Sequence, residues 1–426
     1  TLALALGAQD GATIPTADWS SQPGYLVAWG SPGHVAVGSV PSGSDFVSIG
    51  AGQFFGLAIR SDGSLVHWGS NPYGVATVPD TSGGTFQQVT GGFQHALALR
   101  SDQACVGWGR SDPPHDQSAF QAGPFQSISA YEDFSVGLYL DGTGKAWGYQ
   151  EGGLPYTPMA GHVPGGAPFQ ELIAAHGAIL GLRLDGSLAI AGPGNLAAEP
   201  LPAGPFTAID GGRRYAVALH TDGSLRAWGV AGATAMPEIE TEVPSGTDFV
   251  AVSGGLDVAA ALRVDGTVVG WGGAYDAATW SPPTEGGFRQ VAAGANFFVA
   301  LRPCGALPYG EGLGGAHVLT LTAPSSPSLG GTFTMEVTGA SLGPVTFAIA
   351  GAPAALPLFG GTLLLDPGSL ILSLPAAVSA GAATVSLPVP GTLPPGLEVR
   401  AQAFAPDPAV PGFVALSNGL HLALCP

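Results

Sequence analysis

The sequence predicts an all-β fold, and three observations indicate it. Its 426 residues include 68 Gly and 38 Pro, which favour many turns. A cassette of about 40 residues recurs along the first two thirds of the chain, with apolar residues that alternate rather than follow a helical period. Beyond residue 316 this repeat gives way to short alternating runs separated by Gly, Pro and Ser.

Each cassette is predicted to contain a β-hairpin. The first reads FVSIGAGQFFGLAIRSDGSLVHWG, residues 46–69, with a turn at Asp62-Gly63 sixteen residues after its leading Phe and a Trp six residues later. Asp-Gly after an alternating run is a strong hairpin signal, because Gly accepts the positive φ of the turn. The leading Phe recurs seven times, at Phe46, Phe86, Phe125, Phe169, Phe206, Phe249 and Phe288.

The two ends of the repeat indicate a closed ring. Residues 23–30, PGYLVAWG, match the second half of a cassette, while the last cassette, residues 288–305, contains only a first half. Repeated sheet units that cannot bury their own faces are typical of a β-propeller, and closure removes exposed strand edges. We therefore expect a seven-bladed β-propeller closed by an N-terminal strand.

The repeat also resembles a known family. The segments LAIRSDGSLVHWG, residues 57–69, and VALHTDGSLRAWG, residues 217–229, resemble repeats of the regulator-of-chromosome-condensation propellers. Over residues 23–305 the short period is most similar to compact bacterial members with β-lactamase-inhibitory-protein-like repeats. The resemblance implies a propeller that serves mostly as a protein-binding surface, and fold alone does not fix function.

The remaining chain is expected to divide into three further segments. Residues 1–22 are predicted to be an N-terminal strand and tether, residues 306–315 a linker, and residues 316–426 an immunoglobulin-like β-sandwich. The last segment, which contains SNGL near its end, is similar to C-terminal modules of exported bacterial proteins. That similarity implies no chemistry.

Composition excludes some functions and suggests a location. A net charge of −18 argues against nucleic acid as a partner, and no apolar run is long enough for a membrane span. The three cysteines lead us to expect a disulfide between Cys304 and Cys425 that fixes the ring to the sandwich, with Cys105 as a buried thiol. We expect an extracellular or cell-surface protein.

No pattern of catalytic or metal-ligating residues stands out. The nine His are scattered without close ligand spacing, and no nucleophile or phosphate-binding motif stands in a suitable context. We expect no enzymatic activity, no cofactor and no metal.

One repeat position, two residues before each turn, holds five arginines among Arg60, Arg100, Tyr139, Arg183, His220, Arg263 and Arg302. They form either a crown that binds an anion or a partner, or side chains that each pair with the turn Asp or stack on a neighbouring Trp and so stabilise their own blades.

Partner contacts are expected in the connections between each Trp and the next Phe, where the sequence varies most. Five aromatic residues there are candidate contacts, although they could equally pack within their own loops: Tyr73, Tyr149, Tyr156, Tyr275 and Trp280.

The first residues, TLALALGAQDG, are either the tail of a secretory signal or a β-strand with Leu2, Leu4 and Leu6 on one face. On the second interpretation they are predicted to add to the sandwich of a neighbouring copy, which gives a head-to-tail filament; otherwise the arm packs on its own chain.

Two functions follow as hypotheses: an extracellular structural or adhesive protein that self-assembles, or a soluble secreted, inhibitor-like propeller that binds another protein or a glycan.

Overall fold

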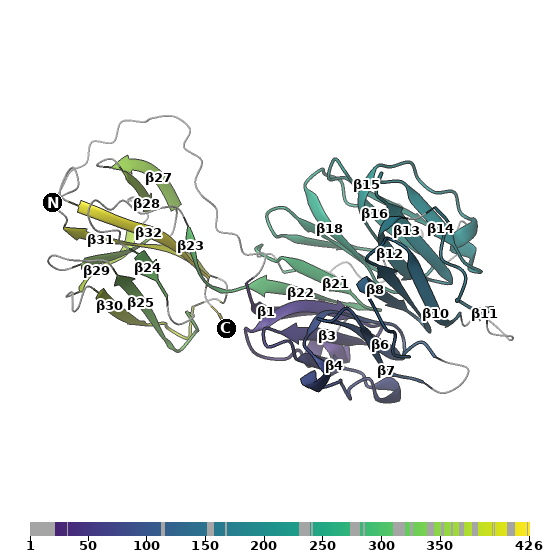
Figure 1. Ribbon diagram of the computed structural model, residues 1–426. Coiled ribbons are helices and arrows are strands. Elements are labelled where there is room, and N and C mark those ends of the chain that lie inside the picture. Colours follow the sequence, from purple (N-terminus) through teal and green to yellow (C-terminus); the bar gives the residue numbers. More distant parts are fainter. Residues whose placement is uncertain are drawn as a thin grey trace. The chain divides into compact units, whose positions relative to one another are not determined.

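The computed structural model divides the chain into two compact units, residues 23–302 and residues 303–426. The structure describes residues 22–426 except 32, 112–115, 151–156, 167, 230–238, 240–241, 273–281, 284–285, 310–319, 324–326, 339–344, 351–352, 359–360, 366–369, 377–381, 394, 396, 407–413 and 424. Both units consist almost entirely of β-strands where the structure describes them (Figure 1).

The first unit is a series of antiparallel sheets built from consecutive strands. One sheet has the order β21 (Gln290–Ala293), β22 (Phe297–Pro303), β1 (Gly24–Gly30), β2 (Phe46–Ala51), β3 (Phe55–Arg60) and β4 (Leu65–Gly69). The next two are β5 (Phe86–Gly91), β6 (His95–Arg100) and β7 (Cys105–Gly109), then β8 (Phe125–Tyr131), β9 (Phe134–Tyr139), β10 (Gly144–Gln150) and β11 (Thr157–Pro158).

Three more sheets complete this unit. They are β12 (Phe169–Ala175), β13 (Ala178–Arg183) and β14 (Leu188–Ala191); β15 (Phe206–Gly211), β16 (Tyr215–His220) and β17 (Leu225–Gly229); and β18 (Phe249–Gly254), β19 (Ala259–Arg263) and β20 (Val268–Trp271). The short helices α1 (Val35–Gly38), η1 (Pro72–Gly74), η2 (Thr81–Gly83) and η3 (Asn195–Ala198) lie in the connections between sheets.

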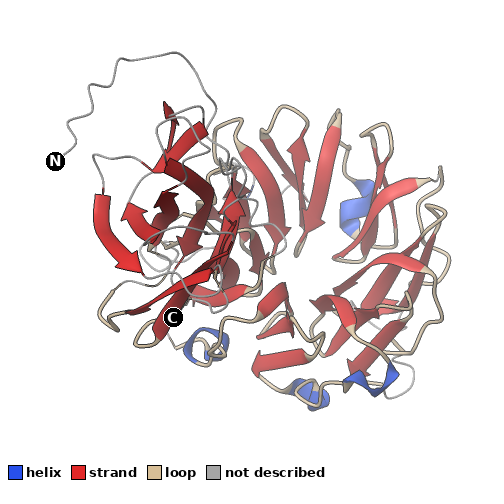
Figure 2. Cartoon of the chain, turned by 60° about the vertical axis from the view of Figure 1, so that its left-hand side comes forward, coloured by secondary structure: helices blue, strands red, loops and turns tan. Residues whose placement is uncertain are grey.

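These sheets form a ring. The strands that start with the recurring Phe, or shortly after it, contact one another in sequence, from β2 through β5, β8, β12, β15 and β18 to β21, and β21 contacts β2. Figure 2 shows the sheets side by side around a centre. The arrangement is that of a β-propeller, with these strands around the axis.

The N-terminal strand β1 completes the sheet that the last strands of the ring begin. It lies between β22 and β2, and the Trp29 ring stacks on the Phe298 ring of β22 with centroids 5.4 Å apart. Gly30 fits against the backbone of Asn296 and Phe297, where a Cβ would lie within 2.6 Å of backbone atoms. The chain thus joins its two distant ends through one sheet.

The hairpin turns follow the pattern expected from the sequence. The carboxylate of Asp62 accepts a hydrogen bond from the backbone N–H of Ser64 over 2.9 Å, and Gly63 adopts φ +80°. The second copy has Gln103 in place of this Gly, and Gln103 nevertheless adopts φ 68°. Since side chains disfavour this region, the second turn is strained.

The second unit contains two larger sheets around one apolar core. The first has the order β23 (Gly305–Tyr309), β32 (Val414–Ala423), β31 (Glu398–Pro406), β26 (Val345–Ala350) and β29 (Leu370–Ala376), and the second is β24 (Thr320–Thr322), β25 (Thr332–Thr338) and β30 (Ala382–Pro388). A separate hairpin joins β27 (Pro353–Leu358) to β28 (Gly361–Leu365). Phe333 and Met335 of one sheet share the core with Phe347, Leu420 and Leu422 of the other.

Two boundary expectations need correction. The predicted linker, residues 306–315, begins as a strand, because β23 pairs along its length with β32 of the second unit. The disulfide between Cys304 and Cys425, with Cα atoms 5.2 Å apart, therefore lies within the second unit, where it joins the two ends of that unit rather than ring to sandwich. This strand could not be predicted from the sequence, because residues 305–309, GALPY, contain neither a turn signal nor clear alternation of apolar and polar residues.

Candidate binding face

The two ends of the ring carry different structures. One end, the turn end, holds the Asp-Gly turns between the second and third strands of each sheet. At the other end each third strand finishes beside the turn between the first two, as Gly69 pairs with Phe55. We call this end the loop face, made by the turns 52–54, 92–94, 132–133, 176–177, 212–214, 255–258 and 294–296 together with the described residues of the connections that leave the third strands.

Backbone hydrogen bonds join neighbouring turns of the loop face into one frame. The N–H of Gln53 donates to the oxygen of Gly92 over 3.1 Å, and the N–H of Ala295 donates to the oxygen of Gln53 over 2.8 Å. Further bonds of this kind run from Phe93 to Glu132, His176 to Gly212, Arg213 to Leu256 and Leu256 to Gly294. Each neighbouring pair of turns is joined in this way except 132–133 with 176–177, which the side chains of Glu132 and His176 join.

The repeated Trp residues anchor the connections to this frame. The indole N–H of Trp68 donates to the backbone oxygen of Ala36, and that of Trp108 to the backbone oxygen of Val75. Trp147 and Trp271 donate in the same way to Gln117 and Ile239. Each bond holds the connection that precedes the Trp's own sheet, so these four connections have a fixed point, whereas the indole nitrogen of Trp228 has no partner among the described residues.

Aromatic rings gather on one part of the loop face. The His34 ring stacks on Phe297 at 4.9 Å and lies 6.4 Å from Phe54, which meets Phe93 edge-on at 5.7 Å. Nearby in the sequence, Tyr73 is 58% exposed, and the guanidinium of Arg110 lies 5.1 Å from the centre of its ring. Exposed or half-exposed rings of this kind are common at protein interfaces.

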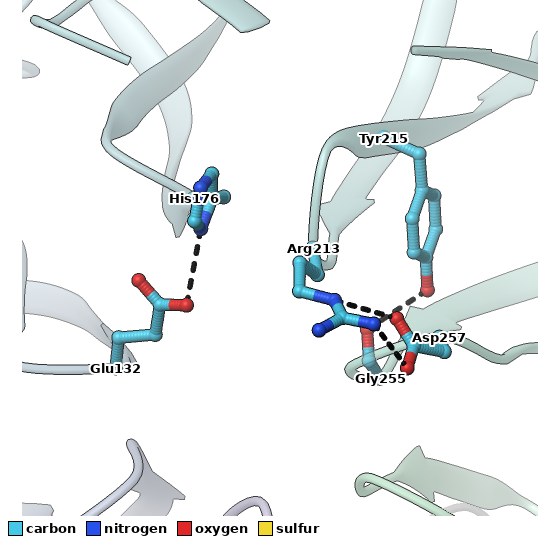
Figure 3. A network of polar contacts seen from close by, with 6 residues as sticks. All are labelled: Glu132, His176, Arg213, Tyr215, Gly255 and Asp257. Atoms are coloured by element: carbon cyan, nitrogen blue, oxygen red, sulfur yellow. Dashed lines mark hydrogen bonds and ion pairs between the residues drawn. The ribbon is translucent and has the colours of Figure 1, made fainter. Parts of the chain in front are cut away.

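Charged pairs occupy another part of the loop face and link turns of neighbouring sheets (Figure 3). Glu132 meets the Nδ1 of His176 at 3.0 Å, and Arg213 donates two hydrogen bonds to Asp257 over 2.9 and 2.8 Å. Burial raises the pKa of Asp257, and the charge of Arg213 opposes that rise. The Tyr215 hydroxyl donates to the backbone oxygen of Val258 and contacts that of Gly255.

Backbone strain is concentrated on the loop face. Among the described residues, four other than Gly have a positive φ, and three of them lie here: Tyr73 at 53°, Glu132 at 44° and Arg214 at 67°. Such conformations cost about 1–3 kcal/mol each and cluster at functional sites. Arg214 is exposed, whereas Glu132 is fixed by its pair with His176.

A cavity of about 270 Å³ lies along the axis, lined by the strands around it. Side chains of these strands bond to the backbone of the next sheet. Gln88, Glu171 and Gln290, two residues after their Phe, accept from the N–H groups of Ile128, Ile209 and Ile49. Ser129, Asp210 and Ser253, four residues after their Phe, accept from Ala174, Gly254 and Ala293.

Glu171 and Asp210 are the acidic members of this set. Burial raises the pKa of Glu171 to about 8 and that of Asp210 to about 6. In each case hydrogen bonds from backbone N–H groups oppose the rise, and the nearby Asp210 adds to that of Glu171. Neither residue was predicted from the sequence. The same repeat positions hold Gln or Ser in some other copies, so an acidic residue there is a signal that the sequence offers.

The candidate contact residues from the sequence are only partly described. Tyr73 lies on the loop face as expected, and Tyr149 lies on β10, where it pairs with Pro158 of β11. Tyr156, Tyr275 and Trp280 lie outside the described residues, as do Leu2, Leu4 and Leu6 of the predicted assembly strand.

The repeated arginine position serves the blades themselves. Arg60 and Arg263 pair with Asp45 and Asp248, and their guanidinium groups lie over Phe46 and Phe249 at 4.7 and 4.3 Å. Arg100 pairs with Asp102, and Tyr139 stacks on Phe125 at 4.5 Å. Arg183, His220 and Arg302 likewise contact the Phe of their own blade. Of the two interpretations, the geometry supports stabilisation of each blade rather than a binding crown.

The most deeply buried histidine is also part of the framework. His95 is fully buried, its Nε2 lies 2.8 Å from the Ser135 hydroxyl, and that hydroxyl donates to the backbone oxygen of Gln117. Burial lowers the pKa of His95 to about 3, so the ring is neutral near pH 7. Within the described ranges, no three His, Cys, Asp or Glu side chains are grouped as a metal site would require.

Comparisons with known proteins agree with this architecture. Residues 46–75 match the family model described as Regulator of chromosome condensation (RCC1) repeat. The structure of human WBSCR16 is similar with a TM-score of 0.51 and 17% identity, over 65% of this chain and 98% of that one. The ring is a β-propeller.

Other propeller-like structures match less closely. The CRINKLY WD40 ectodomain of the receptor kinase ACR4 from Arabidopsis thaliana gives a TM-score of 0.48 at 22% identity, over 61% of this chain and 89% of that one. The ectodomain of the receptor kinase CR4 from Physcomitrella patens gives 0.49 at 22%, over 58% and 66%. No curated protein sequence matches the chain. Among the described residues of both units, no helix is long and apolar enough to cross a membrane.

Proposed function

We propose that this chain is a non-enzymatic binding protein whose propeller recognises another protein through the loop face. The loop face carries the proposal, because it combines half-exposed aromatic rings, exposed Tyr73 and strained Arg214 on a frame held by backbone hydrogen bonds and by the contact of Glu132 with His176. Tyr and Arg dominate the energetics of protein interfaces, and a rigid frame reduces the entropy lost on binding.

The finer features of the fold belong to the same proposal. We take the ring to have seven blades, with β1 completing β21 and β22, and to belong with compact bacterial propellers because its repeat is short. The second unit is taken as an immunoglobulin-like sandwich, since its two sheets share one core. The disulfide between Cys304 and Cys425 supports an extracellular or cell-surface location, where such bonds persist.

A matched pair of variants tests the binding proposal. Tyr73→Ala with Arg214→Ala removes two exposed side chains of the loop face, and Leu184→Ala with Val264→Ala removes two exposed side chains of the turn end. Each immobilised variant is incubated with protein from the organism that encodes the chain, and retained proteins are quantified by mass spectrometry. A partner retained by the wild type should be lost from the loop-face variant and kept by the turn-end variant. Loss from the turn-end variant alone contradicts the assignment.

The second candidate function is self-assembly by strand donation. Within the described part of the second unit, β24 and β30 are the outer strands of one sheet and β23 and β29 those of the other. Outer strands present unpaired backbone groups that can accept a further strand. In this proposal residues 1–6 of one copy add to such an edge of the next, and repetition gives a head-to-tail filament with a structural or adhesive role.

Variants of the two faces of the N-terminal segment test this candidate. Leu2→Asp with Leu4→Asp should abolish polymers seen by size-exclusion chromatography and negative-stain microscopy, while Ala3→Asp with Ala5→Asp adds the same charge to the opposite face and should affect them less. A monomeric wild-type chain, or equal polymers in both variants, excludes strand donation.

A further inference from the structure

The junctions between β12, β15 and β18 differ in charge from the other junctions of the ring. At six junctions of the described ring, all but that between β2 and β5, a side chain from one axial strand accepts a hydrogen bond from an N–H of the next. Most of these acceptors are neutral: Gln88, Ser129, Ser253 and Gln290. Only Glu171 and Asp210 are carboxylates, and they occupy two successive junctions.

The geometry at these junctions is the same as at the neutral ones. Glu171 accepts from the N–H of Ile209 over 2.9 Å, and Gln88 accepts from the N–H of Ile128 over 3.0 Å. Asp210 accepts from the N–H of Gly254 over 2.8 Å, and Ser253 accepts from the N–H of Ala293 over 3.1 Å. A neutral side chain therefore suffices for the structural task, and the carboxylates add a charge that can be gained or lost.

The surroundings of the two carboxylates disfavour that charge. Both border the axial cavity, and neither has an ion-pair partner in the described part of the ring. The ionisable groups on the elements packed around them, besides each other, lie at the two ends of these strands. At the loop face they are Tyr131, Glu132, Asp133, His176, Arg213, Arg214, Tyr215 and Asp257, and at the turn end they are Tyr139, Arg183, His220 and Arg263. Arg213 pairs with Asp257, Arg263 pairs with Asp248, and Arg183 contacts backbone oxygens and Phe169, whereas Arg214 is exposed on the loop face.

We propose that Glu171 and Asp210 form a protonation-controlled clasp that holds β12, β15 and β18 together when the two carboxyl groups are neutral and loosens these junctions when they ionise. Glu171 and Asp210 line the same cavity on successive axial strands, so two negative charges there repel each other, and opening of the junction relieves that repulsion. The raised pKa of each group places this change between mildly acidic and mildly alkaline pH.

Asp210 lies next to a turn of the loop face, whereas Glu171 lies nearer the turn end of its strand, opposite Leu182. Asp210 is followed within β15 and its turn by Gly211, Gly212 and Arg213, and β18 leads into the turn that contains Asp257. Loosening of the junction between β15 and β18 therefore acts on the strands that position the pair of Arg213 with Asp257. The inference concerns the ring itself and stands whether or not the loop face binds a protein.

Amide hydrogen exchange of the full chain tests the clasp with internal controls. Exchange is measured at single-residue resolution at pH 5 and pH 8.5, and each rate is divided by the intrinsic rate at that pH. The protection of Ile209 should fall at least about tenfold between the two conditions and that of Gly254 several-fold, because ionisation favours the open junction. Ile128 and Ile49, held by Gln88 and Gln290, should change less than about twofold.

Two substitutions copied from other blades complete the test. Glu171→Gln should make the protection of Ile209 as independent of pH as that of Ile128, and Asp210→Ser should do the same for Gly254 relative to Ile49. Either variant alone is sufficient if the other does not fold. An equal fall at Ile209 and Ile128 in the wild type, or a fall at Ile209 that persists in Glu171→Gln, overturns the proposal.

Discussion

The indole N–H of Trp68 donates a hydrogen bond over 2.9 Å to the backbone oxygen of Ala36, which lies 32 positions earlier in the chain. Ala36 lies in the connection between β1 and β2, and Trp68 lies on β4, so the bond holds this connection against β4. Since other Trp residues repeat it, we regard it as the main device that fixes the loops of the loop face.

Substitution of Trp68 by Phe tests this device. The change removes the donor and leaves the Ala36 oxygen buried without its partner, so we expect a loss of about 1–2 kcal/mol in the free energy of unfolding. Trp29→Phe is the matched control, because the buried indole nitrogen of Trp29 has no hydrogen-bond partner in the described structure. Urea denaturation of both variants should show the larger loss for Trp68→Phe, and equal losses would contradict the anchoring role.

The strained turn at Gln103 predicts a stabilising substitution. Gln103 occupies the position that Gly63 holds in the first blade, and both have positive φ. Gln103→Gly should raise the free energy of unfolding by about 0.5–1 kcal/mol, because Gly adopts this conformation without the steric cost of a side chain. Gly63→Ala should lower it, since the new Cβ would lie 2.4 Å from the Cβ of Thr85. Destabilisation by Gln103→Gly in thermal or urea unfolding would show that the turn is not strained.

The carboxyl group of Glu171 predicts a specific pH dependence of stability. Its pKa in the folded chain, about 8, exceeds the ordinary value of 4.5, so between these values the folded state binds a proton that the unfolded state releases. This contribution is fully present below pH 4.5 and is lost as pH rises towards 8. Glu171→Gln should therefore stabilise the chain by about 1–3 kcal/mol at pH 8, and by far less at pH 4.5. A gain of equal size at both pH values in urea denaturation would contradict the assignment.

The disulfide should stabilise the second unit selectively. Closure of the loop between Cys304 and Cys425, 121 positions apart, contributes about 4–5 kcal/mol in the chain-entropy description. Cys304→Ser should lower the calorimetric transition of residues 303–426 and leave that of the propeller in place, whereas Cys105→Ala should not affect the second unit. Burial raises the pKa of the Cys105 thiol to about 12, so this residue should resist alkylation in the native chain. Two or more reactive thiols in the unfolded, unreduced chain would exclude the disulfide.

The propeller could be predicted from the sequence because its signals are local and repeated. The Phe, the Asp-Gly turn and the Trp keep constant spacing, and the half-cassette around Trp29 predicts the strand that pairs with β22. The boundary of the second unit was less accessible. β23 is held by its pairing with β32, which lies more than 100 residues later in the sequence. No local pattern in residues 305–309 predicts this contact.

The loop face was only partly predictable for the same reason. Tyr73 stood out as an aromatic residue in a variable connection, but the pairs of Glu132 with His176 and of Arg213 with Asp257 join residues 44 positions apart. Their partnership depends on which turns the ring brings together. The carboxylates Glu171 and Asp210 were visible as odd members of repeat positions, yet only the three-dimensional ring shows that each bonds to the next blade.

Site-specific photo-crosslinking tests the central claim, protein recognition by the loop face, most directly. A photoreactive phenylalanine analogue is placed at Tyr73 on the loop face or at Val264, which is 74% exposed at the turn end, and each chain is irradiated with protein from its organism of origin. The account predicts a discrete crosslinked partner from position 73 that disappears when Arg214→Ala is added, and none from position 264. The same partner crosslinked from position 264, or undiminished crosslinking from position 73 after Arg214→Ala, would contradict it.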